Sequence, residues 1–200
     1  MKYLVIMGSP REKGHTATLL NPFMRELDRR GEEVHYITLR GKTIRGCKEC
    51  LLCQKVMDGP GCSQKDDMND LFPEILSSDV IVLASPIFSW FCTPEMKIVI
   101  DRCFSLSKKY NDLEKKPMLL AGKKVAMITT YGDESGTGPD LFEASVKRLC
   151  SYAEMEFAGH LGVRDVNGID DFTGEEAVAD AKAFAAALAE NRAQGETWTS

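Results

Sequence analysis

Residues 1–20 read MKYLVIMGSPREKGHTATLL, and the fold class can be predicted outward from this stretch. Its apolar run from Tyr3 to Met7 is typical of a strand that is buried on both faces of a parallel sheet. The strand pattern ends at Gly8-Ser9-Pro10, and an apolar helical pattern begins near Leu20. A helix that follows a buried strand and a short loop offers an anion site, because its first backbone N–H groups lack partners within the helix.

The polar residues of this first loop favour a phosphate. Ser9 and Thr16 add hydroxyl donors, and Arg11 adds a guanidinium that can bind two oxygens at once. An ordinary strand-to-helix turn, with Ser and Thr as caps, is the alternative interpretation of the same residues. The loops that follow the later strands are needed to decide between the two.

The composition indicates one globular domain that spans residues 1–200. The chain is 44% hydrophobic and 28% charged, which suits a single α/β domain with a full core. Its net charge of −5 argues against nucleic acid and against a membrane surface as partners. No stretch approaches the roughly 20 apolar residues that span a bilayer, so we expect a cytoplasmic protein. Its seven cysteines are then expected to be reduced thiols or metal ligands rather than disulfides.

Strand and helix patterns alternate five times along the chain. Each connection is long enough for a right-handed crossover, so we predict an α/β fold with a doubly wound five-stranded parallel sheet of order 2-1-3-4-5 and helices on both faces. A capping box at Thr173–Glu176 would open the last helix, and a frayed tail is expected over residues 192–200. The strands are predicted at about residues 2–7, 33–39, 79–84, 124–130 and 156–163, and the earlier helices at about 16–30, 66–78, 93–106 and 141–153.

Two segments lack such patterns. Residues 41–64 form an irregular loop that holds four of the seven cysteines, and a loop of this length is usually functional or disordered. Residues 108–116 are polar and charged, and we expect their lysines, Lys108 among them, to form a solvated surface.

Three loops converge on one edge of the predicted sheet, beyond the carboxyl ends of its strands. A phosphate would lie in residues 9–16, and a flat ring would lie against residues 86–88, with Trp90 as a further candidate. The backbone of residues 130–133 could reach the polar edge of that ring. A phosphate joined to an aromatic heterocycle indicates FMN. A dinucleotide is disfavoured because the first loop lacks the G-x-G-x-x-G pattern. For Phe88 and Trp90, simple packing of the loop on the next helix is the alternative.

Several runs in the chain resemble the flavodoxin-like NAD(P)H-dependent FMN reductase superfamily, and within it most of all the iron–sulfur flavoproteins. These runs are GSPREKGHT (8–16), CKECLLC (47–53), ASPIF (84–88) and TPEMKIVIDR (93–102). The resemblance implies one flavodoxin-like domain, FMN as cofactor, NAD(P)H as co-substrate, and a homodimer or homotetramer. Electrons would pass from NAD(P)H through FMN to a quinone, a flavin or another small-molecule acceptor, and no side chain would act as acid, base or nucleophile.

By position, the resemblance also implies which residues bind FMN. This sequence departs from the family at His15, where Asn is usual, and at Phe88, where Tyr is common. A neutral imidazole could still hydrogen-bond to phosphate, whereas the missing Tyr hydroxyl removes one polar contact. The implied residues are Ser9, Arg11, Gly14, His15 and Thr16 for the phosphate, Pro86, Ile87 and Phe88 for the ring, and Thr130, Tyr131, Gly132 and Asp133 in the third loop.

Four cysteines, Cys47, Cys50, Cys53 and Cys62, form the pattern C-x2-C-x2-C-x8-C. Three closely spaced thiolates and a fourth can hold a cubane [4Fe–4S] cluster, whereas a structural zinc site more often has two separated C-x2-C pairs. In the iron–sulfur flavoproteins that this chain resembles, such a loop binds the cluster close to the flavin. The gap before Cys62 is longer than in the compact motif, so reduced thiols that pack a lid-like loop are the alternative.

Three functions therefore stay open. The first is an NAD(P)H-dependent FMN oxidoreductase. The second is an electron carrier with FMN and a [4Fe–4S] cluster, reduced by a ferredoxin-like partner. The third is a non-catalytic flavodoxin-like module whose cysteines sense redox state. We rank them in this order.

Overall fold

The computed structural model describes residues 1–110, 114, 116–134 and 136–190, so the predicted tail at 192–200 lies outside the described residues. Within these ranges, no helix is both long and apolar enough to cross a bilayer. The strands are β1 Lys2–Met7, β2 Glu33–Thr38, β3 Val80–Pro86, β4 Lys124–Tyr131 and β5 Glu156–Arg164. The helices are α1 His15–Arg29, η1 Leu52–Lys55, α2 Met68–Ser77, α3 Pro94–Arg102, η2 Cys103–Leu106, α4 Asp140–Tyr152, α5 Asp170–Thr173 and α6 Glu175–Glu190, where η marks a 3-10 helix.

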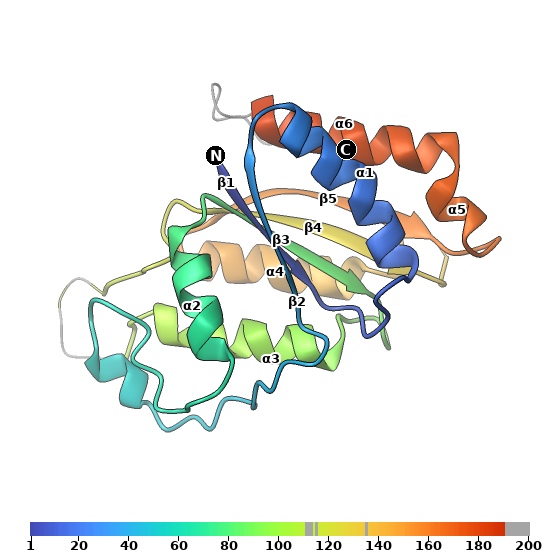
Figure 1. Ribbon diagram of the computed structural model, residues 1–200. Helices are drawn as coiled ribbons and strands as arrows, with labels where there is room; N and C mark the ends of the chain where they lie inside the picture. The colour runs from blue at the N-terminus through green and yellow to red at the C-terminus, as the bar shows by residue number, and fades with distance from the viewer. Residues whose placement is uncertain (111–113, 115, 135, 191–200) are drawn as a thin grey trace.

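The sheet has the order β2-β1-β3-β4-β5, which confirms the predicted doubly wound topology. All neighbouring strands are parallel, and Val5 of β1 pairs with Tyr36 of β2 on one side and with Val82 of β3 on the other. Helices α1, α5 and α6 cover one face of the sheet, and α2, α3 and α4 cover the other (Figure 1). The chain reverses its winding between β1 and β3, so the loops after these strands diverge and leave a crevice at the carboxyl edge.

Alternate residues of β1 face two separate cores. Tyr3, Val5 and Met7 are buried against α1 and α6, and Leu4 and Ile6 are buried on the side of α2, α3 and α4. Because both faces of the strand are covered, its sequence is a continuous apolar run rather than an alternating one.

The start of α6 differs from the predicted capping box. Thr173 is the last residue of the short helix α5, and its hydroxyl donates to the Ile169 carbonyl at 3.2 Å. Gly174 separates the two helices, and its carbonyl accepts the N–H of Val178 at 3.1 Å. The capping-box prediction was wrong because a helix of one turn, too short to show an apolar period, occupies the expected cap.

A buried lysine anchors the cysteine-rich segment. Lys108 is fully buried, and its Nζ donates to the carbonyl oxygens of Cys53 at 3.0 Å and Pro60 at 3.1 Å, and also to the Ser105 carbonyl. The prediction of a solvated Lys108 was wrong, because an ammonium group can be buried where backbone carbonyls accept its protons. Burial lowers the pKa of Lys108 from its ordinary value.

A buried ion pair anchors the ends of the same segment. Arg102, at the end of α3, donates to both carboxylate oxygens of Asp66, at 2.7 and 3.1 Å, and to the Arg45 carbonyl at 2.7 Å. Both side chains of the pair are almost completely buried. The irregular segment at residues 41–64 is therefore held by specific buried contacts, although η1 is its one regular element in the described structure.

Candidate functional site

The three predicted loops meet around one cavity at the carboxyl edge of the sheet, with a volume of about 210 Å³. The structure thus brings together every predicted cofactor-binding residue except Asp133, which is exposed and does not line this cavity. That these residues bind FMN stays a prediction. The lining consists of Ser9, Pro10, Arg11, Gly14, His15, Thr16, Pro86, Ile87, Phe88, Thr130, Tyr131, Gly132 and Asp165.

The N-terminus of α1 opens into this cavity and is suited to an anion. Gly14 is its N-cap residue, no side chain in the described part of the chain caps the helix, and no acidic residue lies in its first turn. The N–H groups of that turn therefore lack helical partners and carry the positive end of the helix dipole. A Cβ atom at Gly14 would lie 3.0 Å from the Arg11 Cβ, so the glycine lets the loop fold tightly over the start of the helix.

Hydrogen bonds fix the three loops relative to one another. The buried hydroxyls of Thr16 and Thr130 lie 2.8 Å apart and join α1 to the end of β4. The Ile87 N–H donates to the Thr130 carbonyl at 2.8 Å and joins the second loop to the third. The Thr93 hydroxyl, at the start of α3, donates to the Gly8 carbonyl at 2.8 Å. The cavity is thus held in place before any ligand arrives, as small-molecule sites usually are.

The cavity has a polar end and an apolar end. At the polar end, the Arg11 N–H donates to the Ser9 hydroxyl at 3.2 Å, which curls the loop in front of α1. At the apolar end, Phe88 remains 46% exposed, although a large aromatic side chain is commonly buried. A ligand with a phosphate at one end and a flat ring at the other fits this division.

Asp165 also lines the cavity, and the sequence did not indicate it. Its Oδ2 lies 2.9 Å from the His15 Nδ1, and its backbone N–H donates to the Tyr131 carbonyl at 2.7 Å. The His15 ring also stacks on Phe172, with ring centroids 4.5 Å apart and an angle of 18° between the planes. The imidazole at the first residue of α1 is therefore held on two sides. No motif surrounds Asp165, and only the position of β5 in the sheet brings it to His15.

A second, larger cavity of about 600 Å³ lies beside the cysteine-rich segment. Cys47, Cys50, Cys53 and Cys62 all line it, together with Cys103 of η2, and α3 and α4 add both apolar and charged side chains. Cys47 and Cys50 are exposed, Cys53 is buried, and all of these cysteines are free thiols. The four cysteines that the sequence groups by spacing are thus also grouped in space.

The thiols around this cavity have different neighbours. The Cys50 Sγ lies 3.4 Å from the Ser63 Oγ, and this hydrogen bond lowers the pKa of the Cys50 thiol. The Cys53 Sγ accepts from the Gln54 side chain at 3.5 Å. Among the residues that the structure describes, no group of three or more His, Cys, Asp or Glu side chains is arranged to hold a metal ion. The assignment of the four cysteines as ligands therefore stays a prediction.

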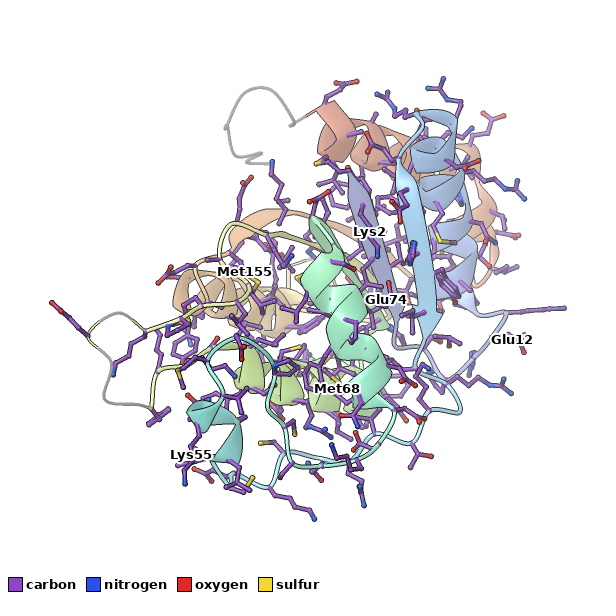
Figure 2. All side chains as sticks on the ribbon, turned by 60° about the vertical axis from the view of Figure 1, so that its left-hand side comes forward. Lys2, Glu12, Lys55, Met68, Glu74 and Met155 are labelled. Atoms are coloured by element: carbon purple, nitrogen blue, oxygen red, sulfur yellow. The ribbon has the colours of Figure 1, made fainter. Side chains whose placement is uncertain are left out.

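The two cavities lie at different ends of α3. Thr93, directly before this helix, contacts Gly8 beside the first cavity, whereas Arg102 at its end lines the second. Figure 2 shows Glu12 of the first loop and Lys55 of η1 on opposite sides of the molecule. The larger cavity is thus not the one where the three loops meet, and the smaller one has the convergent polar groups that distinguish a binding site.

Comparison with known proteins identifies the family. The model of the NADPH-dependent FMN reductase family matches residues 1–142. The chain belongs to this family. An iron–sulfur flavoprotein of Methanocaldococcus jannaschii is 32% identical to it over 136 residues, which are 68% of this chain and 64% of that protein. An FMN-dependent NADH:quinone oxidoreductase of Exiguobacterium is 29% identical over 132 residues, which are 66% of this chain and 62% of that protein.

The fold of this FMN reductase family member is shared with solved structures. An FMN-dependent NADH-azoreductase of Bacillus anthracis, solved in complex with FMN, matches with a TM-score of 0.67 at 15% identity, and the match covers 94% of this chain and 100% of that one. This likeness confirms the predicted flavodoxin-like fold. The matched part of the chain spans less than two thirds of the length of both relatives named above.

The residues of this family member fit the phosphate and ring of FMN. The uncapped start of α1 and the glycine at position 14 leave a cradle for an anion, and Phe88 offers an apolar face at the far end of the cavity. The family match includes all three loops and ends before Asp165. The contact between His15 and Asp165 is therefore a feature of this chain that lies partly beyond the matched region.

Proposed function

We propose that this family member binds FMN where the three loops meet and passes electrons from NAD(P)H to a quinone, a flavin or another small acceptor. The main support for this proposal is the N-terminus of α1, which begins after the N-cap residue Gly14 and is not capped by a side chain. A helix start with free N–H groups, beside a hydroxyl at Ser9 and a guanidinium at Arg11, is suited to a phosphate dianion.

In this proposal, side chains and backbone groups of the protein bind and orient the cofactor. Ser9, Arg11 and the first N–H groups of α1 would hold the phosphate, and Phe88 would lie against the ring. The backbone at the end of β4 and the residue that follows it, Thr130–Gly132, would face the polar edge of the ring. Bound FMN supplies the hydride and electron transfer, so we assign no acid, base or nucleophile.

An anaerobic absorbance experiment tests this function. The protein is loaded with FMN, mixed with NADH or NADPH without oxygen, and then given a naphthoquinone. We expect the visible flavin absorbance to fall after one of the nicotinamides is added and to return after the quinone is added. Unchanged absorbance with both nicotinamides would contradict the proposal.

The four cysteines around one cavity favour a second candidate, an electron carrier that holds a [4Fe–4S] cluster as well as FMN and accepts electrons from a ferredoxin-like protein. Iron and acid-labile sulfide in protein purified without oxygen test this candidate. About four of each per chain would support it. Stoichiometric FMN with neither iron nor sulfide would leave the first function and contradict the second.

A homodimer or homotetramer is part of the proposal, as the resemblance implies. Light scattering on the FMN-loaded protein measures the number of chains directly. A mass of one chain at all concentrations tested would contradict this part of the proposal alone.

A further inference from the structure

The second loop ends in a tight turn whose backbone is unfavourable for its sequence. Ser89 and Trp90 have φ angles of 49° and 62°, in the left-handed region. The turn is closed on both sides, because the Phe88 N–H donates to the Phe91 carbonyl at 2.8 Å and the Phe91 N–H donates to the Phe88 carbonyl at 3.0 Å. Two-residue turns of this kind require positive φ at both central positions and strongly favour Asn-Gly. A tryptophan at the second position is therefore strained.

The flanks of the turn prevent this strain from relaxing. On one side, the Ile87 N–H is bound to the Thr130 carbonyl at 2.8 Å. On the other, the Phe91 ring packs edge-on against Phe142 with centroids 5.2 Å apart, and the Thr93 N–H donates to the Ser85 hydroxyl at 3.1 Å. The turn is thus a rigid projection whose shape the surrounding structure fixes.

Burial does not compensate for the strain at Trp90. Its side chain is 50% exposed, and it has no described ring partner. Phe88, at the start of the same turn, is 46% exposed and lines the cavity where the three loops meet. Trp90 does not itself line that cavity, but only Ser89 separates it from Phe88 in the closed turn, so the half-exposed indole follows directly after a residue that does. Strained residues that packing does not explain are concentrated at functional sites.

We propose that Trp90 is a specificity-determining residue, and that its indole stacks on an aromatic electron acceptor such as a quinone. This inference rests on the proposed function. Residues 85–94 carry no charged side chain, which suits a flat uncharged ring better than the phosphates of a nicotinamide dinucleotide. Offset stacking between an indole and such a ring favours binding, and a rigid turn loses little freedom when the ring is bound.

A pair of glycine variants separates recognition from strain. Both Trp90→Gly and Ser89→Gly relieve the left-handed backbone, but only the first removes the indole. We expect each to raise Tm by about 2–4 °C, the shift that corresponds to relief of one strained residue in a chain of this size. Trp90→Gly should also raise the KM for a naphthoquinone by about three- to tenfold, the range that loss of one aromatic pair gives. Ser89→Gly should keep the wild-type KM.

Three further measurements define what the indole contacts. With the small inorganic acceptor ferricyanide, Trp90→Gly should keep the wild-type KM, because no ring is stacked. Trp90→Phe should keep the KM for the quinone within about twofold of wild type, because a ring remains. The Kd for FMN and the KM for the nicotinamide should not change in Trp90→Gly.

The outcomes keep the two proposals distinguishable. A wild-type KM for the quinone in Trp90→Gly would overturn the role of Trp90 while the proposed function stands. A rise in the Kd for FMN or in the KM for the nicotinamide, rather than in the KM for the quinone, would overturn it as well. Wild-type protein that binds no FMN, or that does not turn over with any acceptor, would overturn the proposed function itself and this inference with it.

Discussion

The His15 Nδ1 lies 2.9 Å from the Asp165 Oδ2, although the two residues lie at the start of α1 and just after β5. The structure thus places the Asp165 carboxylate within hydrogen-bonding distance of the His15 imidazole, at the uncapped N-terminus of α1. In the imidazolium form both ring nitrogens donate. If Nδ1 donates to Asp165 in that form, Nε2 is the remaining donor of the ring, and we propose that it binds the phosphate of FMN.

Substitution of His15 tests this arrangement. His15→Ala should weaken FMN binding about five- to tenfold, because it removes one charge-assisted hydrogen bond, and should not change the affinity for riboflavin, which has no phosphate. His15→Asn is the matched control and should keep most of the affinity, since its amide still donates. Flavin fluorescence titrations give both constants.

The effect of Asp165→Asn on the affinity for FMN distinguishes two possible roles of the carboxylate. If Asp165 positions His15, this variant should weaken FMN binding a few-fold, because Nδ1 loses a charged acceptor. If the carboxylate only repels the phosphate, the same variant should bind FMN more tightly. Tighter binding would therefore contradict the role assigned to the pair.

The close contact between Gly14 and Arg11 at the start of α1 leads to a second prediction. Gly14→Ala places a Cβ 3.0 Å from the Arg11 Cβ, so the loop must move away from the start of α1. We expect the Kd for FMN to rise at least about tenfold, because the N–H groups and Arg11 no longer converge. Gly46→Ala is the control, because a Cβ at that position would meet no neighbouring atom within 4 Å, and its affinity for FMN should be unchanged.

The hydroxyl pair between Thr16 and Thr130 leads to a third prediction. Thr130→Val leaves the buried Thr16 hydroxyl without its partner and should lower the free energy of unfolding by about 1–3 kcal/mol. The double variant, Thr16→Val with Thr130→Val, should lose less than the sum of the two single variants, because no unpaired hydroxyl remains. Urea unfolding curves measure all three; strictly additive losses would mean that the pair does not form.

Much of the fold could be predicted because its strands are covered on both faces. Continuous apolar runs such as residues 3–7 and 80–84 are typical of parallel strands, and the long connections between them leave few topologies. The three loops were predictable for the same reason, since carboxyl ends of parallel strands meet at one edge. The apolar pattern therefore determines where the loops converge before any side chain in them is considered.

The remaining features depend on contacts that no local pattern encodes. Lys108 and Arg102 resemble surface residues in the sequence, and they are buried only because carbonyls and a carboxylate distant in sequence surround them. Asp165 reaches His15 through the sheet order alone. The left-handed backbone at Trp90 follows from the anchored flanks of its turn, since the local preference of tryptophan is the opposite.

The buried pair of Asp66 and Arg102 leads to a prediction about acid stability. Burial raises the pKa of Asp66, but hydrogen bonds from Arg102 and from the N–H groups of Arg45 and Met68 outweigh it and hold the pKa at about 2. Because this value lies below that of the unfolded chain, about 3.9, the stabilisation is complete above about pH 4 and is lost as the pH falls toward 2.

The variant Asp66→Asn should remove this dependence. It should lose about 3–5 kcal/mol of stability near neutral pH, because Arg102 stays buried without a charged partner, and its unfolding midpoint should then fall less steeply below pH 4. Asp70→Asn, at an exposed position on α2, is the control and should keep the wild-type profile. An equally steep acid profile in Asp66→Asn would show that other carboxyl groups cause the loss.

We propose above all that the start of α1 holds the phosphate of FMN, and a paired titration of the wild-type protein with FMN and riboflavin is the direct test. We expect one FMN per chain and an affinity for riboflavin that is at least about tenfold weaker, because only FMN carries the group that the helix start and Arg11 bind. Equal affinity for the two flavins, or no binding of FMN, would contradict it.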